Sequence, residues 1–239
     1  MNLIRVIALL LLCSPALAQR DIDFKPLEWP ASGSIVIPVA EGEALTGLAA
    51  ALDERTGGAL TMAVAVAAFT GEEHQTLTQF GIKPYSRIDL VGVGGEPVDR
   101  IGAEEFGGLA ASLNDGASGT GVSILWSGIE RNDNATAARV AFGYRLGDYR
   151  FDRYQQERLE ADKRGSVFIY SDDADAGEQF DGDLVHLASA FYLARDLSSE
   201  PGTIIYPQSF VDRQREEFRG LNNVKIRVVD ETDMKRRGM

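Results

Sequence analysis

RIDLVGVGGEPVDRIGAEEFGGLAASL, residues 87–113, is the stretch that decides the fold. Residues 87–93 are rich in aliphatic and β-branched side chains, which favours a buried strand. Residues 99–113 repeat their apolar side chains at helical spacing, and the resulting stripe consists of Ile101, Phe106, Leu109, Ala110 and Leu113. A strand that is followed directly by a helix of this length is the repeating unit of a parallel sheet.

The same alternation extends on both sides of this stretch. We expect further strands at 34–37, 122–126 and 167–170, and further helices at 44–55, 134–150 and 181–197. Residues 60–69 fit a strand and a helix equally well, so their structure stays open. Residues 19–33 are expected to form an extended lead-in. The sequence therefore predicts an α/β fold, with a mixed, mainly parallel sheet between helices on both faces.

The helix predicted at 181–197 is so apolar that we expect burial on most of its sides. After this helix the sequence becomes more polar. Beyond it we expect a polar linker helix at 207–219, a strand at 224–229 and a last helix capped by Asp230. These elements have too few apolar residues to form a hydrophobic core of their own, so we expect them to pack against another domain. The predicted boundaries are 19–197 for the domain and 198–239 for the linker and the start of a following domain.

Residues 1–18 have the pattern of a signal peptide. Arg5 precedes the apolar run 6–12, and the small residues of Ala16-Leu17-Ala18 suit a signal peptidase. The run is too short to span a bilayer as a helix, although a buried N-terminal helix would carry the same apolar residues. We therefore expect cleavage before Gln19, a periplasmic or secreted mature chain, and no membrane attachment after cleavage.

Charge and cysteine content exclude several classes of partner and site. The formal net charge is −12, and a surface that negative repels phosphate backbones, so nucleic-acid binding is not expected. The only cysteine, Cys13, lies in the signal peptide. The mature chain is therefore expected to have neither a disulfide framework nor a thiolate metal site.

The densest acidic segment is DDAD at 172–175, which continues to Glu178, Asp181 and Asp183. It precedes a predicted helix, where negative charge stabilises the helix N-terminus. The segment lacks the later oxygen ligands and the distal glutamate of a calcium loop. We interpret it as a solvated capping loop, with a weak cation site as the alternative.

The two histidines offer little chemistry on sequence grounds. His74 is expected in the polar turn 71–78, facing solvent, and His186 is expected as a satisfied core residue inside the apolar helix. The alternative is that the fold brings both together as a metal or catalytic pair, since residues far apart along a chain can meet in space.

Three short motifs are equally weak. The glycines of 92–95 fall short of a dinucleotide fingerprint because Pro97 occupies the place of its third glycine. Residues 116–120 lack one glycine of a nucleophile elbow, and no histidine adjoins Ser118. The triplet Asn134-Ala135-Thr136 matches a glycosylation acceptor. We expect backbone turns and loops at all three places.

Several segments, taken in order, resemble the leucyl aminopeptidase (cytosol aminopeptidase) family. They are the strand end 90–94, the turn 69–71, the run 143–154, and Arg195-Asp196-Leu197 with Pro201 and Pro207. The lysine that is usual after the turn is Glu72 here. The last segment is similar to the family's junction between its N-terminal domain and its catalytic domain, so the chain resembles the N-terminal domain plus linker, truncated before the catalytic domain.

The resemblance implies a macro-domain-like fold for 19–197 and, in the complete enzyme, removal of N-terminal residues from peptides. It also implies two divalent ions (manganese, zinc or magnesium) and a homo-hexamer, and both depend on the catalytic domain. No catalytic, cofactor-binding or metal-binding residue is therefore assigned to this chain, which is expected to hold no metal ion and to be inactive alone. The alternative is a free-standing macro-like module that binds ADP-ribose or a related nucleotide near 92–95.

Overall fold

The computed structural model describes residues 19–42, 44–115, 121–155 and 164–239. The chain divides into two compact units, Met1–Ser189 and Ala190–Met239, and each is described by itself. The predicted signal peptide, residues 1–18, lies outside the described residues, as does the segment 116–120.

The first unit is built on one six-stranded sheet with the strand order β1-β6-β5-β2-β4-β3. The strands are β1 (Ile22–Pro26), β2 (Gly33–Val39), β3 (Thr76–Phe80), β4 (Tyr85–Gly92), β5 (Val122–Trp126) and β6 (Val167–Ser171). All neighbouring pairs are parallel except β3 with β4, which is antiparallel. The mixed, mainly parallel sheet that the sequence predicts is therefore confirmed.

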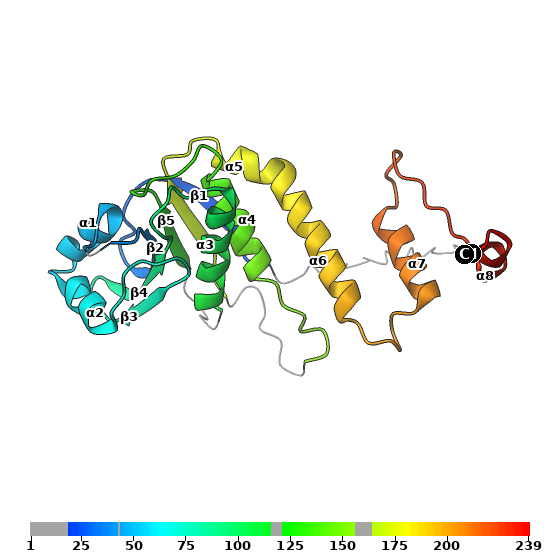
Figure 1. Cartoon of the computed structure of the whole chain (residues 1–239), viewed down its shortest axis with the longest axis horizontal. Helices are drawn as coiled ribbons and strands as arrows, with labels where there is room; N and C mark the ends of the chain where they lie inside the picture. Colours follow the sequence, from blue (N-terminus) through cyan, green and yellow to red (C-terminus); the bar gives the residue numbers. More distant parts are fainter. Residues whose placement is uncertain (1–18, 43, 116–120, 156–163) are drawn as a thin grey trace, which may run out of the picture. The chain divides into compact units, whose positions relative to one another are not determined.

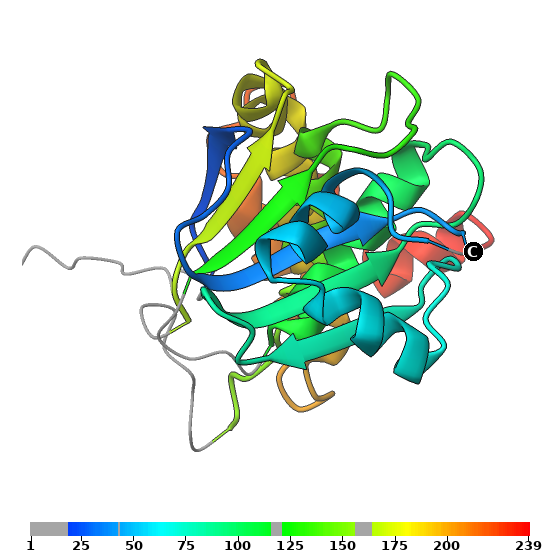
Figure 2. The same ribbon diagram turned by 90° about the vertical axis from the view of Figure 1, so that its left-hand side faces the viewer.

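Helices cover both faces of this sheet (Figure 1). The helices α1 (Gly47–Arg55) and α2 (Ala59–Ala67) lie on one face, which Figure 2 turns toward the viewer, and α3 (Arg100–Leu113) and α4 (Ala137–Gly147) lie on the other. Side chains of β2 alternate between the two cores: Ile35 and Ile37 belong to the core under α1, while Val36 belongs to the core under α3. This alternation is the period of a strand that is buried on both faces.

The helices α3 and α4 approach each other backbone to backbone because glycines lie at the contact. A Cβ added to Gly107 would lie 2.8 Å from the backbone nitrogen of Tyr144, and one added to Gly143 would lie 2.6 Å from the carbonyl carbon of Glu104. No larger residue fits either place without moving a helix. The glycine that opens the run 143–154 therefore has a packing role.

A buried polar network crosses the amino edge of the same sheet. Arg20 donates to the Tyr144 hydroxyl (2.8 Å) and to the carbonyl of Asn114 (3.0 Å). The Asn114 side chain accepts from Ser34 (3.1 Å) and donates to Asp89 (3.3 Å). Because the Tyr144 phenol is buried, its pKa rises to about 12. The network ties Arg20, which lies just before β1, to β2, β4, α3 and α4.

Several local expectations need correction or completion. Residues 60–69, which were open, form most of α2 rather than a strand. The expected extended lead-in contains β1, whose partner β6 comes almost at the other end of the unit. The expected polar turn 71–78 is shorter, because β3 begins at Thr76 and pairs with β4. Both added strands lie at the edges of the sheet.

The predicted closing helix differs in both length and burial. It is preceded by α5 (Ala176–Gln179) and a π-helical turn, η2 (Phe180–Leu184), before α6 (Val185–Ser199) begins. Leu187 and Phe191 are each 44% exposed, so the expectation of burial on most sides is wrong. The predicted core position of His186 is also wrong, because its side chain is exposed.

The second unit contains α7 (Pro207–Glu217) and α8 (Glu231–Arg236). Asp230 caps α8 as expected, since its side chain accepts from the backbone nitrogen of Asp233 (2.8 Å). The strand expected at 224–229 is wrong, because these residues have no strand pairing. Large apolar side chains of this unit are exposed, among them Phe210, Leu221, Val228 and Met234. No described helix is long and apolar enough to cross a membrane.

Two buried tyrosines provide a matched test of this core. The Tyr85 hydroxyl is buried and has no hydrogen-bond partner among the described residues, whereas the Tyr144 hydroxyl accepts from Arg20. We expect Tyr85→Phe to leave the free energy of unfolding unchanged or to raise it by up to about 1 kcal/mol, because an unsatisfied group is removed. Tyr144→Phe should lower it by about 1–3 kcal/mol, because a buried guanidinium loses its acceptor.

Urea unfolding of both variants beside the wild-type chain measures this difference. A loss for Tyr85→Phe as large as that for Tyr144→Phe would contradict the assignment of the two environments.

Candidate functional site

The carboxyl edge of the sheet is the place where parallel α/β folds bind ligands. Here it is formed by the segments that follow β2, β4, β5 and β6, together with the turn that leads into β3. The glycines of 92–95 lie at this edge, directly after β4.

Backbone segments at this edge are in direct contact. Gly71 has a φ of +78°, and a Cβ added there would lie 2.5 Å from the carbonyl oxygen of Ala40. A Cβ added to Gly92 would lie 2.7 Å from the carbonyl carbon of Gly71. The turn before β3 is therefore pressed between the ends of β2 and β4, and only glycine permits that approach.

The backbone nitrogens of the 92–94 turn already have partners. Gly92 donates to the carbonyl of Gln75 (2.7 Å), Val93 to that of Val39 (3.0 Å) and Gly94 to that of Gly71 (3.1 Å). A phosphate-binding turn needs such nitrogens to be available to the ligand. The residues beside this turn line a cavity of only about 10 Å³, whereas ligand pockets usually measure about 300–1,000 Å³. The expected backbone turn agrees with this geometry, and the nucleotide alternative finds no support in it.

His74 lies in the turn before β3 and is 53% exposed, as a solvent-facing residue should be. Its ring nitrogen Nε2 is 2.9 Å from Oε2 of Glu105 on α3. The ligand atoms of Glu73, His74 and Glu105 all lie within 4.8 Å of one another. His186 is not part of this group, so the structure does not bring the two histidines together at it. Sequence reasoning missed Glu105, which is 31 residues from His74.

The acidic segment 172–175 is organised around an arginine. Arg131 pairs with Asp172 (2.8 Å) and with Asp173 (2.7 Å). The other oxygen of Asp173 accepts from the backbone nitrogen of Ala137 (2.6 Å), the first residue of α4. The hydrogen bond that Arg131 donates to Asp173 raises the pKa of Arg131. The segment is therefore a capping loop, but Asp173 caps α4 rather than the helix that follows it in sequence.

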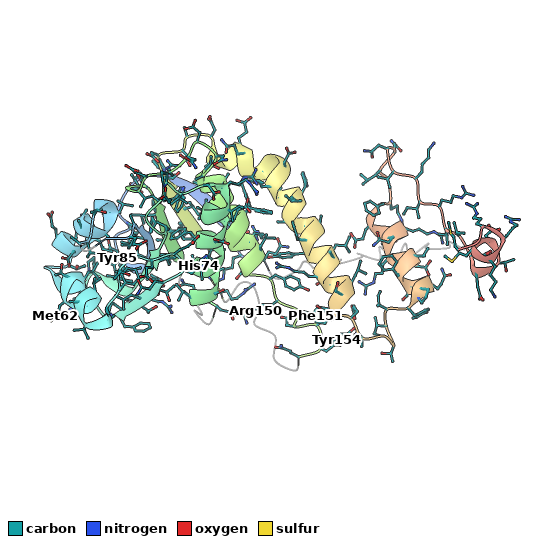
Figure 3. All side chains as sticks on the ribbon, viewed as in Figure 1. Met62, His74, Tyr85, Arg150, Phe151 and Tyr154 are labelled. Atoms are coloured by element: carbon teal, nitrogen blue, oxygen red, sulfur yellow. The ribbon has the colours of Figure 1, made fainter. Side chains whose placement is uncertain are left out.

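A polar hollow lies beside the run 143–154, after the end of α4. A cavity of about 320 Å³ is lined by Ser112, Asp115, Gly147, Tyr149, Arg150, Phe151, Asp152 and Gln155. Arg150 donates to the carbonyl of Asp115 (2.6 Å) and forms an ion pair with the Asp115 side chain. Burial lowers the pKa of Arg150. Figure 3 shows Arg150, Phe151 and Tyr154 in this stretch, where the rings of Phe151 and Tyr154 meet edge to face at 5.8 Å. These residues form no catalytic constellation.

A two-metal hydrolase centre does not fit the described residues. Such a centre needs several carboxylates or imidazoles that converge on both ions. Among residues 19–42, 44–115, 121–155 and 164–239, the group of Glu73, His74 and Glu105 is the one set of three or more potential ligands that lie together, and all three are exposed. It offers too few ligands for two ions, so no hydrolytic step is assigned to this part of the chain.

The pairing of Asp173 generates a stability prediction. We expect Asp173→Ala to lower the free energy of unfolding by about 2 kcal/mol, because it uncaps α4 and removes the less exposed of the two carboxylates that pair with Arg131. Asp172→Ala is the matched control, since Asp172 is 58% exposed against 16% for Asp173. It should cost less than about 0.5 kcal/mol. Thermal unfolding of both variants measures the difference. An equal loss of stability in the two variants would contradict the role of Asp173 as a cap of α4.

The closed carboxyl edge generates a binding prediction. Titration of the chain with ADP-ribose in a calorimeter should give flat heats at millimolar ligand, because the turn at 92–94 has its nitrogens engaged and lacks room for a nucleotide. Inorganic pyrophosphate should behave in the same way. A saturable heat with ADP-ribose would mean that this edge opens, and it would restore the binding-module alternative.

Comparison with known proteins shows which group this chain resembles. Residues 36–158 match the model of the cytosol aminopeptidase family, N-terminal domain. A probable cytosol aminopeptidase of Caulobacter vibrioides is 34% identical over 229 residues, which cover 91% of this chain and 44% of the relative. A probable cytosol aminopeptidase of Gluconobacter oxydans is 31% identical, covering 86% of this chain and 41% of the relative. The chain thus spans less than half the length of these relatives.

Solved structures show the same fold. A mutant of tomato leucine aminopeptidase aligns with a TM-score of 0.75 over 94% of this chain and 47% of its own, at 17% sequence identity. The bottromycin maturation enzyme BotP in complex with Mn aligns with a TM-score of 0.54 over 79% of this chain. At these identities the likeness concerns the fold.

The comparisons correct the expected localisation and decide the family. The relatives bear the name cytosol aminopeptidase, which points to the cytosol, so the expectation of an exported, periplasmic or secreted chain is wrong. The resemblance drawn from the segments at 69–71, 90–94 and 143–154 is confirmed. The chain belongs to the cytosol aminopeptidase family, and it corresponds to the N-terminal domain of that family.

Proposed function

We propose that this chain is the non-catalytic N-terminal part of a metal-dependent leucyl aminopeptidase, an enzyme that removes N-terminal residues from peptides. The observation that carries the proposal is the match of residues 36–158 to the N-terminal domain of the family. The site geometry supports it, because the described residues contain no constellation suited to peptide hydrolysis. The activity thus belongs to the complete enzyme, and the chain alone is inactive.

The metal requirement follows from the same reasoning. We assign two divalent ions, manganese, zinc or magnesium, to the complete enzyme and to residues outside the part described here. The manganese complex of the structural neighbour BotP supports this choice of ion class. Peptide substrate is bound through the catalytic part, so this chain contributes the scaffold beside it.

Residues 198–239 act as the linker and the start of the following domain. Their exposed apolar side chains, including Phe210, Leu221 and Val228, support this role. Side chains of that kind are normally covered by a partner surface. The complete enzyme assembles as a homo-hexamer, and the net charge of −12 argues against nucleic acid as a partner.

A pair of assays tests this proposal. Purified residues 19–239 should release no leucine from leucyl peptides above the blank rate, even with millimolar manganese present, because no two-metal centre fits them. A chimera that joins residues 19–197 to the catalytic part of the Caulobacter vibrioides relative should release leucine. Chelator-sensitive turnover by the fragment itself, or a folded but inactive chimera, would contradict the proposal.

A further inference from the structure

The turn that carries His74 is held by several hydrogen bonds. Its His74 backbone has a φ of +65°, a left-handed conformation that histidine adopts rarely. The backbone nitrogen of His74 donates to the carbonyl of Gly92 (3.2 Å). The Gln75 side chain accepts from the backbone nitrogens of Thr70 (2.8 Å) and Gly71 (3.0 Å). Such conformations persist where the surroundings impose them, and they are frequent at functional sites.

The helix that carries Glu105 is equally well fixed. The Asp99 side chain caps α3 by accepting from the nitrogen of Gly102 (2.9 Å). The glycine contact described above sets the distance between α3 and α4. Glu105 therefore faces the turn from a rigid support, and His74 Nε2 meets its carboxylate at 2.9 Å. Preorganised ligands on rigid elements are what a binding site requires.

Glu73 brings a second carboxylate to the same point. The ligand atoms of Glu73, His74 and Glu105 lie within 4.8 Å of one another, so two negative charges are held close together. A divalent cation between them would offset that repulsion. The same three residues, with Gly92, Val93 and Phe106 among their neighbours, line the cavity of about 10 Å³. That volume is about the room of one water-sized particle, which suits a single ion.

We propose that Glu73, His74 and Glu105 form an open site for one divalent transition-metal ion, with Zn²⁺ as the best fit. An imidazole nitrogen with two carboxylates is a ligand set that zinc accepts, whereas magnesium and calcium prefer oxygen ligands alone. Water completes the coordination, because the three side chains are exposed. The ion would join the turn before β3 to α3. This replaces the sequence-based expectation that the chain holds no metal, and it does not depend on the proposed function.

Calorimetry of the untagged full chain, stripped of metal with EDTA, tests the site directly. Zinc chloride should give a saturable heat with one ion per chain, and magnesium chloride should give none. Replacing His74 with asparagine, which tolerates left-handed backbone, and the separate replacement Glu105→Gln should each weaken zinc binding by at least about tenfold. The matched control is His186→Asn, which changes the other exposed histidine and should bind zinc as the wild type does.

Far-UV circular dichroism establishes that each variant is folded, and Glu105→Gln leaves the strained backbone of His74 untouched. Zinc affinity that survives both His74→Asn and Glu105→Gln would overturn the site. So would a loss in His186→Asn equal to that in His74→Asn, or a wild-type chain that gives no saturable heat. None of these measurements involves peptide hydrolysis, so they test the metal site independently of the proposed function.

Discussion

At the carboxyl edge of the sheet, backbone segments pack directly against each other without side chains between them. This close contact is the constraint on which the geometry of the edge depends. Gly71 and Gly92 let the turn before β3 sit against the ends of β2 and β4, and the peptide nitrogens of 92–94 are used in holding it there. In most parallel α/β folds this edge is the binding cleft. Here the same geometry closes it to nucleotides while fixing the turn that presents His74.

The two ends of the sheet are held by different chemistry. At the carboxyl edge the contacts are between main-chain groups, so they depend on the absence of side chains. At the amino edge the contacts run through buried side chains, with Asn114 joining Ser34 to Asp89 and Arg20 joining α3 to α4. Buried polar groups are costly unless satisfied, so this network specifies one arrangement of its elements. Arg131 and Asp173 play a comparable part beside α4.

What the sequence could predict was local, and what it missed was distant. The strand at 87–93 and the helix at 99–113 carry their periodicity within a few residues, so both were foreseen. The edge strands β1 and β3 owe their structure to pairing partners, and their own residues alternate only weakly. The exposure of α6 and of His186 depends on what packs beside them. The pair of His74 and Glu105 joins two elements, and no spacing rule reveals it. The family could be predicted because several motifs occur in the right order along the chain, whereas the wrong expectation of export depended on the single segment 1–18, which lies outside the described residues.

The register of β1 against β6 has a consequence for the way the protein is made. Ile22 pairs with Val167 and Pro26 with Ser171. The first strand of the sheet, β1, therefore cannot pair with β6 until β6, the last strand of the sheet, has been synthesised. Contacts between such remote segments form slowly, since a long loop has to close first. During synthesis, Ile22 and Phe24 therefore remain without their neighbours while β2, β4 and β5 assemble. Translation speed and chaperones can act on the nascent chain during that interval.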